Sequence, residues 1–146
     1  MTEKEFSIFL PKAEISQDEI GSIDINSILL KDDSIISESD LIAYDKTTHS
    51  LKLSASSCER VMSLKYGTIV FVCVGRKPIY WGVIWSNILS AGFNGVVLLK
   101  AAPWEKDKCK IRIECGYPSE WFTGKDPRDN PEIMNSLRKA GKLKTD

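Results

Sequence analysis

The sequence has few of the residues from which most catalytic and metal sites are built. Among its 146 residues there is one histidine, His49, and the four cysteines form no Cys-x-x-Cys pair. The ligand spacing of a zinc or dithiol site is therefore missing. A glycine-rich phosphate loop and a Gly-x-Ser-x-Gly elbow are absent as well. We expect no metal and no cofactor, and the sequence gives little support for an enzyme.

Long apolar segments are also absent. No apolar run approaches the ~20 residues that a membrane-spanning helix needs, so no membrane span is expected. The first five residues are polar, whereas a secretory signal has a basic and then an apolar region. These features predict a cytoplasmic protein, or an exported one if a leader has been removed.

The sequence has no excess of charge of either sign, with 20 Lys and Arg against 20 Asp and Glu. Residues 1–60 are acidic overall and residues 61–146 are basic, so the two halves can neutralise each other in one domain. The basic runs Lys106–Arg112 and Arg138–Lys144 are not interleaved with aromatic residues, as the basic surfaces of single-strand binders are. We expect no nucleic-acid partner.

The cysteines are predicted to be free thiols. Cys109 and Cys115 fall on one predicted strand, where six residues at about 3.3 Å each separate them by roughly 20 Å, beyond the reach of a disulfide. Cys73 lies within an apolar run, where a thiol behaves as a small apolar group. A bridge between Cys58 and Cys73 is the alternative, but buried free thiols fit a reducing compartment.

Two apolar runs give the strongest structural signal. Ile69–Val74 and Ile79–Trp85 flank the turn residues Gly75–Pro78, which predicts two neighbouring strands in the middle of a sheet. The other expected elements are a strand at 6–10, capped turns at 16–20 and 37–40, a hairpin over 41–53, a helix from the Ser56 cap to about 65, a strand at 96–99, an edge or half-exposed strand at 109–115 and a helix at 131–140 capped by Asp129 or Asn130.

This order of elements predicts one α+β domain over residues 1–146. We expect a mainly antiparallel sheet with helices packed on one face. A chain of this length can bury about two thirds of its unfolded surface, so its core needs no metal or disulfide to be stable.

Aromatic residues provide the main functional hypothesis. Trp81 and Trp85 share one face of the predicted strand and Tyr80 takes the other, and large aromatics often belong to the core. They can also form a contact wall beside the small-residue loop that runs from Ser86 to Phe93. We predict a non-catalytic binding or protein-interaction domain that contacts a protein or peptide through Tyr80, Trp85, Ser86, Ser90, Phe93 and Trp121.

Two other hypotheses come from different classes. A small hydrolase or transferase would need Asp45, His49 and Arg60 to converge, with His49 close to a carboxylate inside a cleft. An exposed turn is the usual place for such a histidine. Alternatively, the chain could assemble with itself through an open sheet edge at residues 109–115. The oligomeric state is not predicted.

Several segments resemble known families. Leu51–Ser54, Cys58–Val61 and Ile69–Tyr80 resemble the periplasmic head of SecD, a protein-export auxiliary, in the order of strand, Arg-bearing helix, apolar strand, Gly-containing turn and return strand. That match covers about residues 35–99. The chain is also similar to a family of uncharacterised bacterial and archaeal proteins, at Ser37–Asp40, Tyr44–Asp45, Thr48–His49, Pro78–Tyr80, Trp85–Ser86, Phe93–Val97, Gly116–Ser119, Asp126–Arg128 and Ala140–Leu143.

These resemblances imply a fold but no reaction. They suggest a SecD-head-like core of sheet and helix, followed by a C-terminal extension of strand, loop and helix at about 108–143. Nothing in them assigns a substrate or a catalytic residue to this chain.

Overall fold

The structure, a computed structural model, describes residues 5–86, 92–101, 105–117, 120 and 122–144. Its strands are β1 (Phe6–Phe9), β2 (Leu41–Asp45), β3 (Ser50–Leu53), β4 (Ile69–Val74), β5 (Lys77–Trp85), β6 (Phe93–Leu99), β7 (Lys110–Tyr117) and β8 (Leu143–Lys144). Its helices are α1 (Gln17–Ile20), α2 (Ala55–Met62) and α3 (Pro131–Lys139), with 3-10 turns η1 (Ile25–Ser27) and η2 (Glu38–Asp40). The fold is α+β, as predicted.

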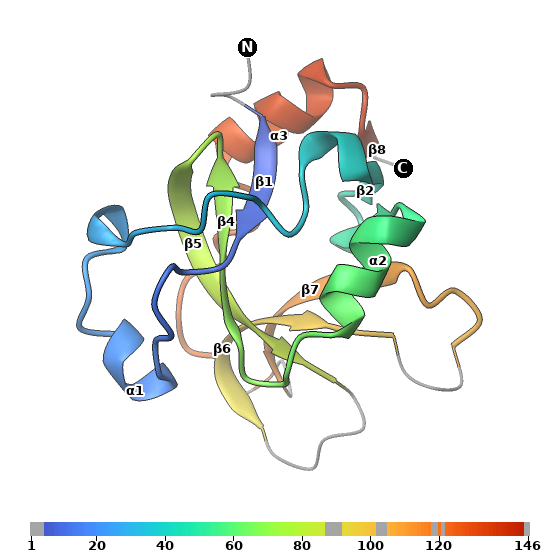
Figure 1. The fold of residues 1–146 in the computed structure, drawn as a ribbon. Helices are drawn as coiled ribbons and strands as arrows, with labels where there is room; N and C mark the ends of the chain where they lie inside the picture. Colours follow the sequence, from blue (N-terminus) through green and yellow to red (C-terminus); the bar gives the residue numbers. More distant parts are fainter. Residues whose placement is uncertain (1–4, 87–91, 102–104, 118–119, 121, 145–146) are drawn as a thin grey trace.

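The described strands form one sheet in the order β1-β4-β5-β6-β7-β3-β2-β8 (Figure 1). The pairs β5–β6 and β2–β8 are parallel and the other neighbours are antiparallel, so the sheet is mainly antiparallel. The hairpin of β2 and β3 and the pairing of β4 with β5 confirm the sequence prediction. Strand β7 lies between β6 and β3, so it is not an edge strand, and the predicted open sheet edge at residues 109–115 is wrong. Its alternation of buried and partly exposed side chains fits the other half of the prediction, a half-exposed strand.

The turn between β4 and β5 explains why these two strands meet. Only Gly75 and Arg76 separate them, and Gly75 has a φ of 63°, which glycine adopts without strain. Strand β5 therefore begins at Lys77, two residues earlier than the apolar pattern indicated. All six side chains of β4 are buried, as expected for a strand covered on both faces.

Two apolar clusters lie on opposite faces of the sheet. Alternate residues of β5 separate as predicted, with Tyr80 in one cluster and Trp81 and Trp85 in the other. The cluster that contains Tyr80 also includes side chains from α2 and α3, so both helices cover the same face of the sheet. The cluster that contains Trp81 and Trp85 is covered by Ile20 of α1 and by other apolar residues of the segment 15–30.

The helix boundaries follow local capping chemistry. At α3, Asn130 Oδ1 accepts hydrogen bonds from the Glu132 and Ile133 amides, and Pro131 occupies the first turn. The same helix ends at Lys139, and Gly141, which follows its C-cap residue Ala140, has a φ of 73°. At α2 the prediction of a Ser56 cap is wrong, because the Ser54 hydroxyl accepts from the Ser57 amide. Among the described helices none is long and apolar enough to span a membrane.

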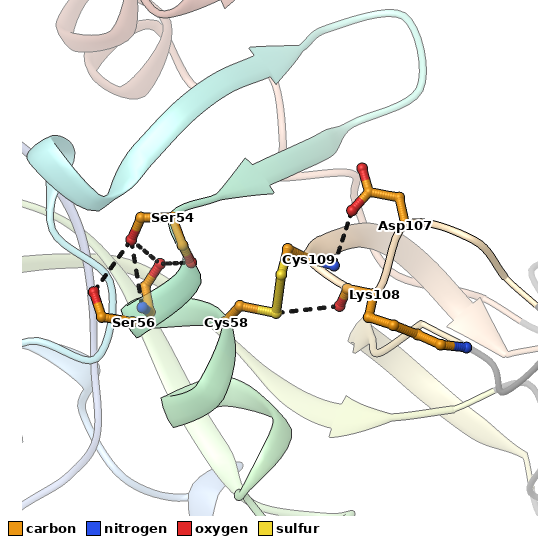
Figure 2. Close-up of a disulfide and its surroundings, with 7 residues drawn as sticks. Ser54, Ser56, Cys58, Asp107, Lys108 and Cys109 are labelled. Carbon is orange, nitrogen blue, oxygen red and sulfur yellow. Dashed lines mark hydrogen bonds between the residues drawn. A yellow bond between two sulfur atoms is a disulfide. The ribbon is translucent and has the colours of Figure 1, made fainter.

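A disulfide joins α2 to the start of β7. Cys58 is bonded to Cys109, 51 positions later, and their Cα atoms lie 5.1 Å apart (Figure 2). The bridge contradicts the prediction that all four thiols are free, and the alternative pairing of Cys58 with Cys73. Cys73 is buried inside β4 and is free, and so is Cys115. Because Leu53 and Cys109 are hydrogen-bonded neighbours through their backbones, the following helix places Cys58 next to Cys109.

Reduction of this disulfide is predicted to destabilise the domain. Opening a 51-residue loop restores chain entropy to the unfolded state, worth about 4 kcal/mol in the loop-entropy description. Urea unfolding with and without dithiothreitol measures the loss. The double variant Cys58→Ser/Cys109→Ser is the control, because its midpoint should not respond to the reductant. Two reactive thiols in the denatured, unreduced protein are expected, and four would contradict the bridge.

Candidate functional site

The aromatic residues proposed as a contact wall are mostly in the interior. Tyr80 and Trp85 expose 7% and 9% of their surface, and Ser86 is also buried. Phe93 is half-buried and packs against Trp85, with ring centroids 5.9 Å apart. This corrects the prediction of an exposed wall at Tyr80, Trp85 and Ser86, since β5 has a strand on each side and apolar residues on both faces. Ser90 and Trp121 lie outside the described residues.

The three residues of the hydrolase hypothesis do not converge. Arg60 forms an ion pair with Asp40 at 2.8 Å and donates to the Ile35 carbonyl at 3.1 Å. Asp45 instead accepts the amide of Thr47 within the β2–β3 turn. His49 stands apart from both and is 8% exposed, which contradicts its expected place on an open turn.

The ring of His49 is held by its neighbours. The Tyr44 hydroxyl lies 2.9 Å from Nδ1, and burial raises the pKa of Tyr44 well above its ordinary value. The phenol therefore stays protonated and donates to Nδ1, so the proton of the neutral imidazole is assigned to Nε2. Nε2 faces a carboxylate oxygen of Asp129 at 3.7 Å. With the lone pair of Nδ1 already engaged, His49 has no free nitrogen to act as a general base.

A basic groove lies where the segment after β1 approaches the turn between α2 and β4. Its volume is about 370 Å³. The groove contains the side chains of three lysines and one acid, and several apolar residues. We refer to it as the lysine groove, and its lining residues are Leu10, Pro11, Lys12, Glu14, Ile15, Lys31, Lys65, Tyr66, Gly67, Thr68 and Ile69.

A buried lysine fixes one wall of the lysine groove. Lys100 follows β6 and donates from Nζ to the carbonyl of Met62, at 3.0 Å, and to that of Leu64. The first carbonyl belongs to the last residue of α2 and the second lies just beyond the helix, where a cation satisfies groups that the helix leaves unpaired. The same ammonium lies 4.8 Å from the ring centroid of Tyr66. Tyr66 is 44% exposed, so it presents an open aromatic face that a cation–π contact holds in place.

An arginine fixes the opposite wall. Arg76 donates to the carbonyls of Leu30, Lys31 and Asp32 at 3.1–3.2 Å, and its guanidinium lies 4.7 Å from the ring centroid of Phe9. The backbone of Lys31 is also bonded to Leu10, since its amide donates to the Leu10 carbonyl at 3.0 Å. Both walls of the lysine groove are therefore set by contacts within the fold before any ligand arrives.

The sequence analysis missed this groove because its parts are far apart in the chain. Lys65 and Tyr66 look like the polar end of a helix, and Lys31 looks like a solvated loop residue. One local signal was available, because Lys100 is a single cation directly after the apolar run of β6. A lysine in such a position is buried only when it has acceptors to bind.

Comparisons with known proteins do not identify the chain. No protein-family model, no curated protein and no solved structure matches it. The resemblance to the SecD head therefore stays a prediction. In the described residues there is also no group of three or more His, Cys, Asp and Glu side chains that could bind a metal ion.

Protonation of His49 is predicted to weaken the fold. Burial, and next the positive charge of Arg128, lower the pKa of His49 below its ordinary value of about 6.5, although Asp129, Asp126 and Glu114 act in the opposite sense. As the pH falls below 6.5 the unfolded chain gains this proton first, so stability is complete above that pH and is lost as the pH falls through the folded-state pKa. Asparagine tolerates the positive φ at this position. Urea unfolding from pH 7.5 to 5.5 should show a steeper loss for the wild type than for His49→Asn, and parallel curves would contradict the prediction.

Loss of Lys100 is predicted to destabilise the end of α2. In Lys100→Met the carbonyls of Met62 and Leu64 lose their donor, at a cost of about 1–3 kcal/mol. The control is Lys106→Met, which removes the charge of an exposed lysine and should change stability by less than about 0.5 kcal/mol. Urea unfolding at neutral pH measures both. Equal effects of the two variants would show that the buried contacts of Lys100 are unimportant.

Proposed function

We propose that the chain is a non-catalytic binding domain that takes an acidic, partly apolar peptide segment of a protein partner into the lysine groove. The observation that carries the proposal is the combination of three lysines with a fixed, exposed tyrosine over an apolar floor. Lys12, Lys31 and Lys65 have no ion pair or side-chain hydrogen bond within the described part of the chain.

Charge supports an acidic ligand. The three ammonium groups face a single acid of the lining, Glu14, so the groove has an excess of positive charge in a chain whose net charge is zero. Such a local field attracts acidic segments and speeds their encounter with the surface. Each exposed ion pair contributes little affinity, so the charge of the groove determines which partner is selected more than how tightly it binds.

The apolar part of the lining supplies the holding contacts. Leu10, Ile15 and Ile69 lie beneath the charged rim, and Tyr66 adds a rigid aromatic face beside them. Tyrosine in a preorganised position often dominates binding energy, since little side-chain entropy is lost on contact. A space of about 370 Å³ accommodates one or two large side chains, which fits a short motif better than a broad interface.

The predicted contact surface also included the loop from Ser86 to Phe93, and this part of the prediction stays untested. Phe93 remains half-buried at the end of the loop from Ser86, and residues 87–91 and Trp121 lie outside the described residues. The alternative hydrolase or transferase loses its support, because Asp45, His49 and Arg60 are engaged in three separate sets of contacts.

The disulfide indicates the kind of compartment in which the domain would bind its partner. Disulfides persist in oxidising surroundings and are rare in the reducing cytosol. We therefore propose that the domain works in an oxidising compartment, in line with the exported alternative rather than with the cytoplasmic one. The bridge between Cys58 and Cys109 also anchors α2, and Lys65 and Tyr66 follow shortly after the end of this helix.

Binding of a labelled peptide tests the proposal. The probe is a synthetic peptide in which Asp and Glu alternate with Leu and Phe, and its counterpart has Lys at the acidic positions. Fluorescence anisotropy should show binding of the acidic peptide that weakens with added salt. Tyr66→Ala should weaken binding about tenfold, and reversal of each groove lysine to Glu by up to about fivefold.

The matched control is Lys125→Glu, which reverses an exposed lysine that does not line the groove. Its affinity for the acidic peptide should equal that of the wild type. Equal binding of the two peptides, or unchanged affinity in the triple variant Lys12→Glu/Lys31→Glu/Lys65→Glu, would rule the proposal out.

A further inference from the structure

A second cleft lies at the other end of the sheet, around His49. It has a volume of about 510 Å³ between the β2–β3 turn, the outer face of β7 and the loop before α3. Each described residue that lines it is polar or charged, in contrast to the lysine groove. Two segments that the sequence analysis singled out, Thr48–His49 and Asp126–Arg128, meet here although they are far apart in the chain.

Arg128 and Asp126 form an ion pair in the wall of this cleft, and their charges neutralise each other. Arg128 donates to both carboxylate oxygens of Asp126, at 2.9 and 2.8 Å, and to the carbonyl of Ile113 at 2.9 Å. The hydrogen bonds of this pair lower the pKa of Asp126 and raise that of Arg128. Since β3 ends its pairing with β7 near Ser50, Arg128 also satisfies the edge of β7 beyond that point. The pair therefore sets the shape of the cleft and leaves no charge over for a ligand.

The remaining charges of the lining are balanced, and three of the four have no ion pair among the described residues. Lys110 and Arg112 are positive, and Glu114 and Asp129 are negative. Within the described residues, Lys110, Arg112 and Glu114 have no side-chain hydrogen bond or ion pair, and Asp129 has only the 3.7 Å approach to His49. Arg112 is half-buried as a residue, and no ion pair or side-chain hydrogen bond to another described residue engages its guanidinium. Such a cation is better satisfied when a ligand supplies an acceptor.

The spacing of these charges selects a ligand that has both signs close together. Arg112 and Glu114 are two residues apart on β7, so they share a face with their Cα atoms about 7 Å apart. His49 also lines the cleft, and its Nε2, to which the proton is assigned, lies 3.7 Å from a carboxylate oxygen of Asp129, so it adds a donor beside that acid. A ligand with a carboxylate and an ammonium on neighbouring atoms can be bound by the cations and the acids at once.

The turn between β2 and β3 sets the position of the His49 ring. The φ of His49, 52°, is the only positive value among the described residues other than glycine, and His49 closes the turn, where hairpins commonly have a left-handed residue. The ring lies against the Tyr44 hydroxyl and lines the cleft.

We infer that the cleft around His49 binds a small zwitterion of the α-amino-acid type with a hydrophilic side chain. Arg112 and Lys110 take the carboxylate, aided by the Nε2 proton of His49, and Asp129 and Glu114 take the ammonium. The absence of apolar lining disfavours large apolar side chains. This site is separate from the lysine groove and takes a different class of ligand.

Calorimetric titration with three probes tests the inference. L-serine carries both charges, D-glycerate carries only the carboxylate and ethanolamine carries only the ammonium. L-serine should bind at least tenfold more tightly than either of the other two. Arg112→Gln should weaken L-serine binding at least tenfold and Asp129→Asn several-fold, while Arg112→Lys, which retains the charge, should have an intermediate effect.

Two controls separate the site from the fold and from the lysine groove. Arg138→Gln removes an exposed arginine of α3 that does not line the cleft, and Tyr66→Ala alters only the lysine groove. Both should bind L-serine as the wild type does. Unfolding midpoints of all variants verify that they fold. If Arg112→Gln does not fold, Asp129→Asn still tests the site, because it changes an exposed side chain. If D-glycerate binds as tightly as L-serine, the inference that the ligand is a zwitterion is wrong. If none of the three probes gives a binding heat, the inference of a ligand site in this cleft is wrong.

Discussion

The pairing of β4 with β5 is the constraint on which the rest of the structure depends. Strand β4 is buried along its whole length, with β1 on one side and β5 on the other. Its first residue, Ile69, lies at the floor of the lysine groove. The turn that leads into it is tied back to β5, since the Gly67 amide donates to the Ile84 carbonyl at 2.7 Å. The groove is thus built on the most buried backbone of the molecule.

Helix α2 illustrates how a short helix can carry a binding wall. Eight residues are too few for a helix to be stable alone, so tertiary contacts must supply its stability. Those contacts come from both ends. The disulfide fixes its first half to the strand that begins at Lys110, and Lys100 donates to the carbonyl of its last residue, Met62. The residues that follow the helix inherit a fixed position from these two attachments.

Elements governed by neighbouring residues could be predicted from the sequence. The apolar runs of β4 and β5, the Asn130 cap and the Ser16 and Ser37 capping boxes all depend on chemistry within a few positions. The sequence also predicts that Tyr80 and Trp85 face opposite sides, because alternation is a property of any strand. Their burial was not predictable, since it depends on which segments cover the sheet.

Features that depend on distant residues could not be predicted. The bridge of Cys58 with Cys109 spans 51 positions, and strand β7 enters the interior of the sheet because β3, far earlier in the chain, pairs with it. The lysine groove and the cleft around His49 have the same origin. Each combines segments that are close only after the sheet has formed, so no local pattern marks their residues as neighbours.

The outer strands of the sheet restrict how this molecule can meet others. A returning segment already engages the backbone of β1 through a bridge from Ile8 to Ile36, and the residues just after β1 through a bridge from Pro11 to Leu30. At the opposite side β8 offers only two residues. Among the described strands there is therefore little free main chain on which a foreign strand could extend the sheet, as it does in amyloid or in strand-addition complexes. Recognition by this fold is left to side chains, which favours reversible and selective encounters over templated growth.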